Sequence, residues 1–320
     1  MMKKYVLIPV IAALVVFTSC QEKKNETKDS NTTEKVKREP FFKLSLAQWS
    51  LNENIRFHGM NPFDFAKVAD SLGFEGLEYV SQLYKPFYEE YGVDALVEKL
   101  AEESKTYNLE NLLIMVDNEG DLADPDEAKR DEAVELHKKW VDAAAALGCH
   151  SIRVNTFGTN DPEIWHEAVV DGLIKLSTYA ATKNINVLCE NHGWLSSDAD
   201  KLMKALEAVN MDNCGTLPDF GNWCIKRKDG EKWGDCEEEY PDKYKGIELL
   251  MPLAKAVSAK SYAFDDDGNE TTLDYVRILK SVKDAGYTGY IGVEFEGGMP
   301  EEKGILDTKN LLLSASEKLN

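Results

Sequence analysis

Residues 185–194 read INVLCENHGW and contain both a strand-like run and two chemically reactive side chains. It begins as an apolar run, typical of a strand buried on both faces, and ends with Glu190 and His192. These two residues are two apart, so their side chains point to the same side of an extended strand. A buried carboxylate is costly unless a cation or a hydrogen-bond donor lies beside it. The stretch therefore predicts a buried strand with a functional carboxylate at its carboxyl end.

The same pattern recurs along the chain, where short apolar runs alternate with longer amphipathic segments. The predicted strands are residues 43–49, 76–80, 111–116, 151–155, 185–190, 215–219, 256–262 and 290–295. The clearest predicted helices are residues 62–72, 126–147, 164–182, 198–209 and 273–285. No glycine-rich phosphate loop follows the first strand, which disfavours a doubly wound sheet. We therefore predict an α/β fold with a single (β/α)8 TIM barrel domain.

Helix ends carry local signals. Three predicted helices stop at Gly73, Gly148 and Gly286, each followed at once by a strand, because glycine can adopt the left-handed conformation that ends a helix. The predicted helix starts are Asp124, Ser196 or Ser197, and Thr271 or Thr272. The repeated glycine signal indicates one repeated architecture.

The N-terminal segment differs from the rest of the chain. Residues 1–19 have a basic start, a short apolar centre and small residues before Cys20, which is the pattern of a secretory signal peptide. The ending Phe-Thr-Ser-Cys resembles a lipobox, so we expect Cys20 to be lipidated; an ordinary signal peptide is the alternative. Residues 20–40 are densely charged and predict a disordered tether. We expect a barrel at residues 41–320, held by lipid in a bacterial cell envelope, on the periplasmic side or in the outer membrane.

The formal net charge of −20 limits the class of partner. An acidic domain repels a phosphate backbone and lacks the basic stripe of nucleic-acid binders. This charge disfavours an AP endonuclease and favours a small-molecule partner, with no contact to a membrane except through the lipid anchor.

The cysteines fall into two groups. Cys149, Cys189 and Cys214 lie in or beside apolar strands, where a free thiol behaves as a small apolar group. Cys224 and Cys236 flank a polar loop, and we predict that they form a disulfide. A zinc site is less favoured, because the loop contains no histidine and no second cysteine pair.

The chemistry of such a barrel lies at the carboxyl ends of its strands. The polar residues predicted there are Gln48, Glu78, Asp117, Asn155, Glu190, His192, Asp219, Lys260, Glu294 and Glu296. Three acidic strand ends that converge on one mouth would repel one another. A divalent cation removes that repulsion, and oxygen ligands favour manganese or magnesium.

Three motifs carry a family resemblance, namely LCENH at 188–192, PDFGN at 218–222 and GVEFEG at 292–297. With them the chain resembles the sugar phosphate isomerase/epimerase group of xylose isomerase-like TIM barrels. The resemblance implies that Glu190, Asp219 and Glu294 bind a divalent metal. It also implies that Glu190 and Glu294 exchange protons with the substrate through a metal-stabilised enediolate.

The chain departs from the family on two strands. Strand seven has no histidine where the family has a metal ligand, and Lys260, or less favourably Ser258, takes that position. Asn222 stands where many relatives carry histidine. We expect Lys260 to act in catalysis or to neutralise a glutamate, and a metal or Lys260 to be the cation beside Glu190. The expected substrate-binding residues are His192, Asn222, Glu78, Asn155 and Glu296.

Three functions follow as hypotheses. The first is an isomerase or epimerase that removes a proton next to a sugar carbonyl. The second is a lyase that uses the same base on 3-keto-glycosides, where the enolate expels the glycosidic oxygen. The third is a non-catalytic envelope protein that binds sugars.

The histidines other than His192 are expected to be structural; they are His58, His137, His150 and His166.

Overall fold

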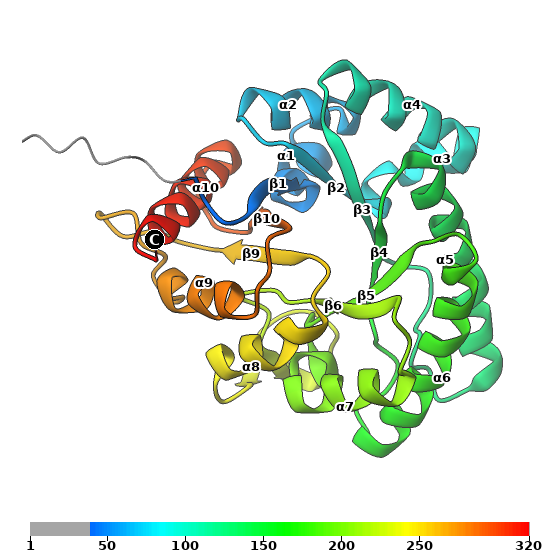
Figure 1. The fold of residues 1–320 in the computed structure, drawn as a ribbon. Coiled ribbons are helices and arrows are strands. Elements are labelled where there is room, and N and C mark those ends of the chain that lie inside the picture. Colours follow the sequence, from blue (N-terminus) through cyan, green and yellow to red (C-terminus); the bar gives the residue numbers. More distant parts are fainter. Residues whose placement is uncertain (1–38, 320) are drawn as a thin grey trace, which may run out of the picture. The chain divides into compact units, whose positions relative to one another are not determined.

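The computed structural model describes residues 39–319, and its centre is a sheet of eight parallel strands surrounded by helices (Figure 1). The predicted signal peptide, Cys20 and nearly all of the predicted tether lie outside the described residues. Among the residues that are described, no helix is long and apolar enough to cross a membrane.

The eight parallel strands follow the order β6-β5-β4-β3-β2-β1-β10-β9. They are β1 (Lys43–Ala47), β2 (Gly76–Val80), β3 (Glu110–Val116), β4 (Ser151–Val154), β5 (Asn186–Glu190), β6 (Cys214–Leu217), β9 (Val257–Ser261) and β10 (Tyr290–Phe295). The two end strands meet through parallel bridges that pair Thr216 with Ala254 and Asp219 with Ser258. The predicted TIM barrel is therefore confirmed.

Helices follow the strands and cover the outside of the barrel (Figure 1). They are α1 (Asn52–Phe57), α2 (Phe65–Ser71), α3 (Lys85–Tyr91), α4 (Val93–Thr106), α5 (Glu127–Leu147), α6 (Pro162–Ala181), α7 (Ala199–Val209), α8 (Lys243–Leu250), α9 (Tyr275–Asp284) and α10 (Glu301–Glu317). Their inner faces are apolar, and Trp140 of α5 and Trp165 of α6 are each 1% exposed. This burial holds the strands, and with them the strand ends, in fixed positions.

The helix ends agree with the sequence better than the helix starts do. Gly73, Gly148 and Gly286 have φ values of 71°, 83° and 75°, as a helix-ending glycine requires. The predicted capping residues were wrong, although the predicted ranges 126–147 and 198–209 begin at the observed caps. Aspartates one to three residues further along accept the first free backbone N–H groups. These N-caps are Asp126, Asp198 and Asp274.

The loop after β6 contains an antiparallel hairpin in place of the expected irregular polar loop. Its strands are β7 (Cys224–Arg227) and β8 (Cys236–Glu239), and a disulfide joins Cys224 to Cys236 with their Cα atoms 5.8 Å apart. Because the hairpin follows the carboxyl end of a barrel strand, it lies at the mouth of the barrel.

Candidate active site

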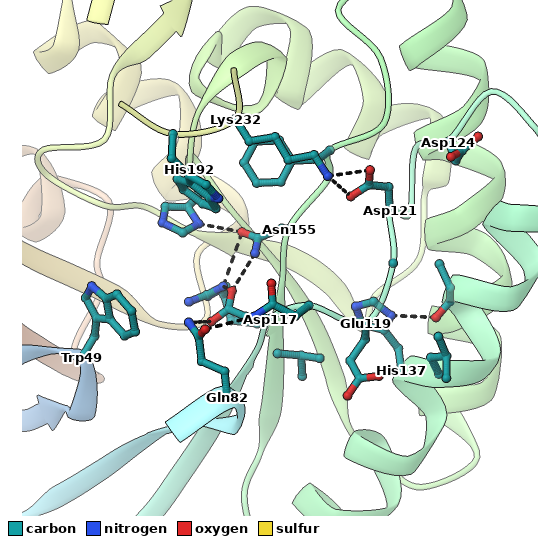
Figure 2. A pocket seen from close by; sticks show the side chains of 18 of the residues that line it. Trp49, Gln82, Asp117, Glu119, Asp121, Asp124, His137, Asn155, His192 and Lys232 are labelled. Atoms are coloured by element: carbon teal, nitrogen blue, oxygen red, sulfur yellow. Dashed lines mark hydrogen bonds and ion pairs between the residues drawn. The ribbon is translucent and has the colours of Figure 1, made fainter. Parts of the chain in front are cut away.

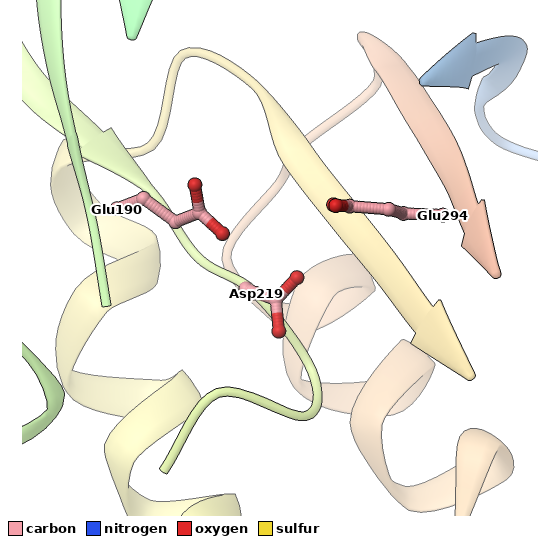
Figure 3. A group of neighbouring side chains, drawn as sticks. All are labelled: Glu190, Asp219 and Glu294. Carbon is pink, nitrogen blue, oxygen red and sulfur yellow. The ribbon is translucent and has the colours of Figure 1, made fainter. Parts of the chain in front are cut away.

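Three acidic side chains converge inside the mouth of the barrel (Figure 3). Glu190 is the last residue of β5, Asp219 follows β6 by two residues, and Glu294 lies near the end of β10. One carboxylate oxygen of each lies within 4.8 Å of those of the other two, and all three residues are buried. The strand ends that the sequence places together are thus neighbours in space.

The cation that pairs with Glu190 is Arg153, whereas Lys260, expected there as the alternative to a metal, pairs with Glu294 and Glu296 instead. The Nε atom of Arg153, on β4, is 2.9 Å from Glu190 Oε2 in an ion pair, although its N–H is not aligned for a hydrogen bond. The amide Nδ2 of Asn222 donates to Glu190 Oε1 at 2.9 Å. Burial nevertheless raises the pKa of Glu190 well above its usual value, with Arg153 acting in the opposite direction.

Arg153 was missed by the sequence analysis. Its guanidinium also donates to Asp117 Oδ1 at 2.8 Å, so it joins the ends of β3, β4 and β5. A signal was present, because an arginine inside a short buried strand needs a carboxylate partner. Arg153 and Asn155 are also two residues apart, so, like Glu190 and His192, they point to the same side of an extended strand.

A single hydroxyl connects the other two acids. The Oγ atom of Ser258 lies 2.6 Å from Asp219 Oδ2 and 2.8 Å from Glu294 Oε2. A serine hydroxyl has one proton, so it cannot donate to two carboxylates at the same time. Burial raises the pKa of Asp219 to about 7, against the influence of Lys260. The second contact therefore requires either a proton on a carboxyl group or a cation.

Lys260 lies on the same face of β9 as Ser258 and is fully buried. Its Nζ atom is 3.0 Å from Glu294 Oε1 and 3.2 Å from Glu296 Oε2. Asp219 Oδ2 is 4.0 Å away. Burial would lower the pKa of Lys260, but these carboxylates raise it well above the usual value, so the side chain is an ammonium.

The three acids fit a divalent cation. Their oxygen ligands are close together and buried, as hard cations require. The carboxylates at this site outnumber the cations. The cations are Arg153 and Lys260, and the carboxylates that pair with them are Asp117, Glu190, Asp219, Glu294 and Glu296. A bound metal would reduce this excess of negative charge.

A cavity of about 950 Å³ has Glu294 in its lining, and Figure 2 shows many of the other side chains that line it. Four predicted substrate-binding residues line it, together with the predicted base Glu294; they are Asn155, His192, Asn222 and Glu296. Glu190, Asp219 and Lys260 are not among the lining residues and lie behind them. The far end of the cavity reaches α5 at His137, whose Nδ1 is 2.7 Å from the carbonyl oxygen of Ala133.

A chain of hydrogen bonds fixes the orientation of the His192 ring and the nitrogen that carries its proton (Figure 2). The amide Nδ2 of Asn155 donates to Asp117 at 2.7 Å, which turns its Oδ1 toward His192 Nδ1 at 2.6 Å. We therefore assign the imidazole proton to Nδ1, leaving Nε2 as an acceptor. Burial, followed by repulsion from Arg153, lowers the pKa of His192 to about 3. His192 is thus a neutral hydrogen-bond acceptor.

Glu78 lies deeper than expected and does not line the cavity. Its carboxyl accepts a hydrogen bond from Ser45 at 2.6 Å, and the Oε2 atom is buried without a partner. A Cβ atom at Gly292 would lie 2.5 Å from the Glu78 oxygens, so the glycine leaves room for them. Burial raises the pKa of Glu78 from 4.5 to about 7.

This fold and this site define a class of protein. A family model described as xylose isomerase-like TIM barrel matches residues 65–314, so the chain belongs to that family.

The individual relatives are similar over different lengths. The "3'-dehydrocarminate deglycosidase alpha subunit" of Microbacterium sp is 42% identical over 48 residues, which are 15% of this chain and 14% of that protein. The chain thus matches only a small part of the length of this relative. The structure of the 3-keto-D-glucoside 4-epimerase YcjR from E. coli is similar with a TM-score of 0.64 and 16% identity, covering 85% of this chain and 99% of that chain. The IOLI protein with a binding zinc atom has a TM-score of 0.64 and 16% identity, covering 87% and 99%.

Proposed function

We propose that this protein is an enzyme that acts on a carbohydrate and removes a proton from the carbon next to a carbonyl group. The observation that carries the proposal is the buried triad Glu190, Asp219 and Glu294, of which Glu294 faces a large cavity. A strand-end carboxylate with access to a ligand is suited to general base catalysis. A structural neighbour that is an epimerase of a keto-glucoside supports a sugar as substrate, and a neighbour with a binding zinc atom supports a metal at this site.

A divalent cation held by Glu190, Asp219 and Glu294 would supply positive charge that stabilises the enediolate formed when the proton leaves. We propose manganese or magnesium, because all three ligands are carboxylate oxygens.

The residues of the chain have separate roles in this proposal. Glu294 lines the cavity and removes the proton, and Glu190 is its partner in proton exchange. The acceptor Nε2 of His192 orients a substrate hydroxyl. Lys260 forms ion pairs with both Glu294 and Glu296, so we assign it the role of holding these two carboxylates in position.

Elimination from a 3-keto-glycoside is the second candidate reaction. The similarity to a deglycosidase subunit favours it, as does a cavity larger than one sugar ring needs. The base would take the proton beside the ketone, and the electrons of that C–H bond would form the enolate. The enolate would then form a carbon–carbon double bond as the bond to the glycosidic oxygen breaks, and that oxygen would take up a proton.

The test is proton exchange in heavy water, measured by NMR with D-tagatose, L-ribulose and methyl 3-keto-β-D-glucopyranoside. We expect deuterium at the carbon beside the carbonyl of at least one compound, and no exchange with Glu190→Gln or Glu294→Gln. Glu302→Gln, an exposed change on α10, is the matched control. Saturable binding without exchange in the wild-type protein would identify a non-catalytic sugar-binding protein.

We also propose that the protein is anchored in the cell envelope through a lipid on Cys20. The lipobox-like sequence before Cys20 supports this proposal. Mass spectrometry of the mature N-terminus tests it, because a diacylglyceryl cysteine is expected there and should be lost with Cys20→Ala. A mature chain without lipid would show an ordinary signal peptide.

A further inference from the structure

The tip of the β7–β8 hairpin lies across the mouth of the barrel. The Nζ atom of Lys232, at this tip, is 2.6 Å from both carboxylate oxygens of Asp121, which lies in the loop between β3 and α5 (Figure 2). The disulfide between Cys224 and Cys236 closes the base of the same hairpin. The hairpin is therefore held at both ends, so its tip forms part of a defined cavity wall.

Three aromatic side chains meet at this wall. The ring of Phe157 lies 5.2 Å from the ring of Trp233 and 5.4 Å from that of Trp194, both in edge-on contact. The indole N–H of Trp194 donates to the carbonyl oxygen of Glu231 at 2.9 Å, which ties the hairpin tip to the η4 turn (Trp194–Ser197). These contacts hold Trp233 against the cavity.

Trp233 keeps an open face. It lines the cavity and is 52% exposed, whereas Phe157 behind it is 5% exposed. Its ring centroid is 5.0 Å from that of His192, which also lines the cavity. An exposed indole beside polar groups binds a flat apolar ring surface, such as an aromatic ring or the C–H face of a sugar.

The cavity has room for a second ring. Its volume of about 950 Å³ lies at the upper end of the range for sites that bind drug-sized ligands, roughly 300–1,000 Å³, so one monosaccharide would leave much of it filled with water. Glu294 and Trp233 both line it, and His192 lies against Trp233. A ring bound over Glu294 therefore leaves Trp233 to contact whatever group is attached to that ring.

We propose that Trp233 is a specificity-determining residue that binds a second flat ring joined to the reacting sugar, so that the substrate is a glycoside and not a free sugar. This inference rests on the proposed function for the identity of the reacting ring. The second ring is an aromatic group or another sugar, which share the flat face that an indole recognises.

The experiment is isothermal titration of the full-length protein with three probes. They are methyl β-D-glucopyranoside, p-nitrophenyl β-D-glucopyranoside and cellobiose. We expect one of the two larger probes to bind about tenfold more tightly than the methyl glycoside, since an aromatic contact adds roughly that much affinity. Which of them does so distinguishes an aromatic group from a second sugar.

The variants isolate the indole. Trp233→Ala should bring the affinity for the larger probe to within about twofold of that for the methyl glycoside, and Trp233→Phe should keep most of the preference. Tyr91→Ala removes another exposed aromatic side chain, which does not line the cavity, and it should have no effect on the affinity for any probe.

Three outcomes would overturn the inference. They are equal binding of all three probes to the wild-type protein, no measurable binding of any probe, and a preference that survives Trp233→Ala. Failure of the proposed function looks different, because the ring preference would then persist in a protein that exchanges no substrate protons.

Discussion

Arg153 Nε lies 2.9 Å from Glu190 Oε2, which places a buried cation from β4 beside the carboxylate that ends β5. The same guanidinium donates to Asp117 at 2.8 Å. Arg153 therefore connects three adjacent strand ends. The acids of this site depend on a residue that is neither a predicted metal ligand nor a predicted catalytic group.

Replacing Arg153 by methionine should destabilise the protein. Glu190 and Asp117 would remain buried without their cation, and breaking such a pair costs about 3–5 kcal/mol of unfolding free energy. Urea denaturation in EDTA measures the loss. Arg153→Lys keeps the positive charge but not the forked set of N–H donors, so it should lose less unfolding free energy than the methionine variant. A loss below about 1 kcal/mol for the methionine variant would show that the pair adds little.

Replacing Lys260 by methionine should strengthen metal binding. The ammonium lies 3.0 Å from Glu294 Oε1 and repels a cation bound to the same carboxylate. We expect the Kd for Mn²⁺ to fall about tenfold or more in isothermal titration, and Mn²⁺ to raise Tm more than in the wild-type protein. Lys67→Met, an exposed change on α2, serves as the control. An unchanged or weaker affinity would mean that Lys260 does not compete with the metal.

Glu78 should make stability depend on pH. Burial raises the pKa of Glu78 from its usual value of 4.5 to about 7 in the folded protein. The folded state therefore holds the proton more tightly than the unfolded state does. The contribution of Glu78 to the unfolding free energy is therefore greatest below pH 4.5, and it falls by about 3 kcal/mol as the pH rises from 4.5 to 7. Glu78→Gln should remove this contribution, which denaturation at several pH values in EDTA would detect. An identical slope in the variant would assign the effect to another group.

The disulfide should stabilise the fold through the hairpin. The two cysteines are 12 residues apart, and closing a loop of that size contributes about 3 kcal/mol in the chain-entropy model. The double variant Cys224→Ser/Cys236→Ser should lose about that much unfolding free energy. Dithiothreitol should produce the same loss in the wild-type protein and none in the variant. A reductant effect of equal size in both proteins would point to a different cause.

Local patterns in the sequence determined the barrel and its acidic mouth. Alternating apolar segments predict strands and helices, and the carboxyl ends of parallel strands meet at one face, so Glu190, Asp219 and Glu294 could be placed together from the sequence. The glycine helix ends followed from backbone conformation in the same way.

The partner of each acid depends on the tertiary structure and could not be predicted from local patterns. Arg153, not Lys260, lies beside Glu190, because the closure and twist of the barrel determine which inward side chains of neighbouring strands meet. The contact of Lys232 with Asp121 joins residues 111 apart in sequence. Such contacts depend on how loops are oriented in space, and no local periodicity encodes that orientation.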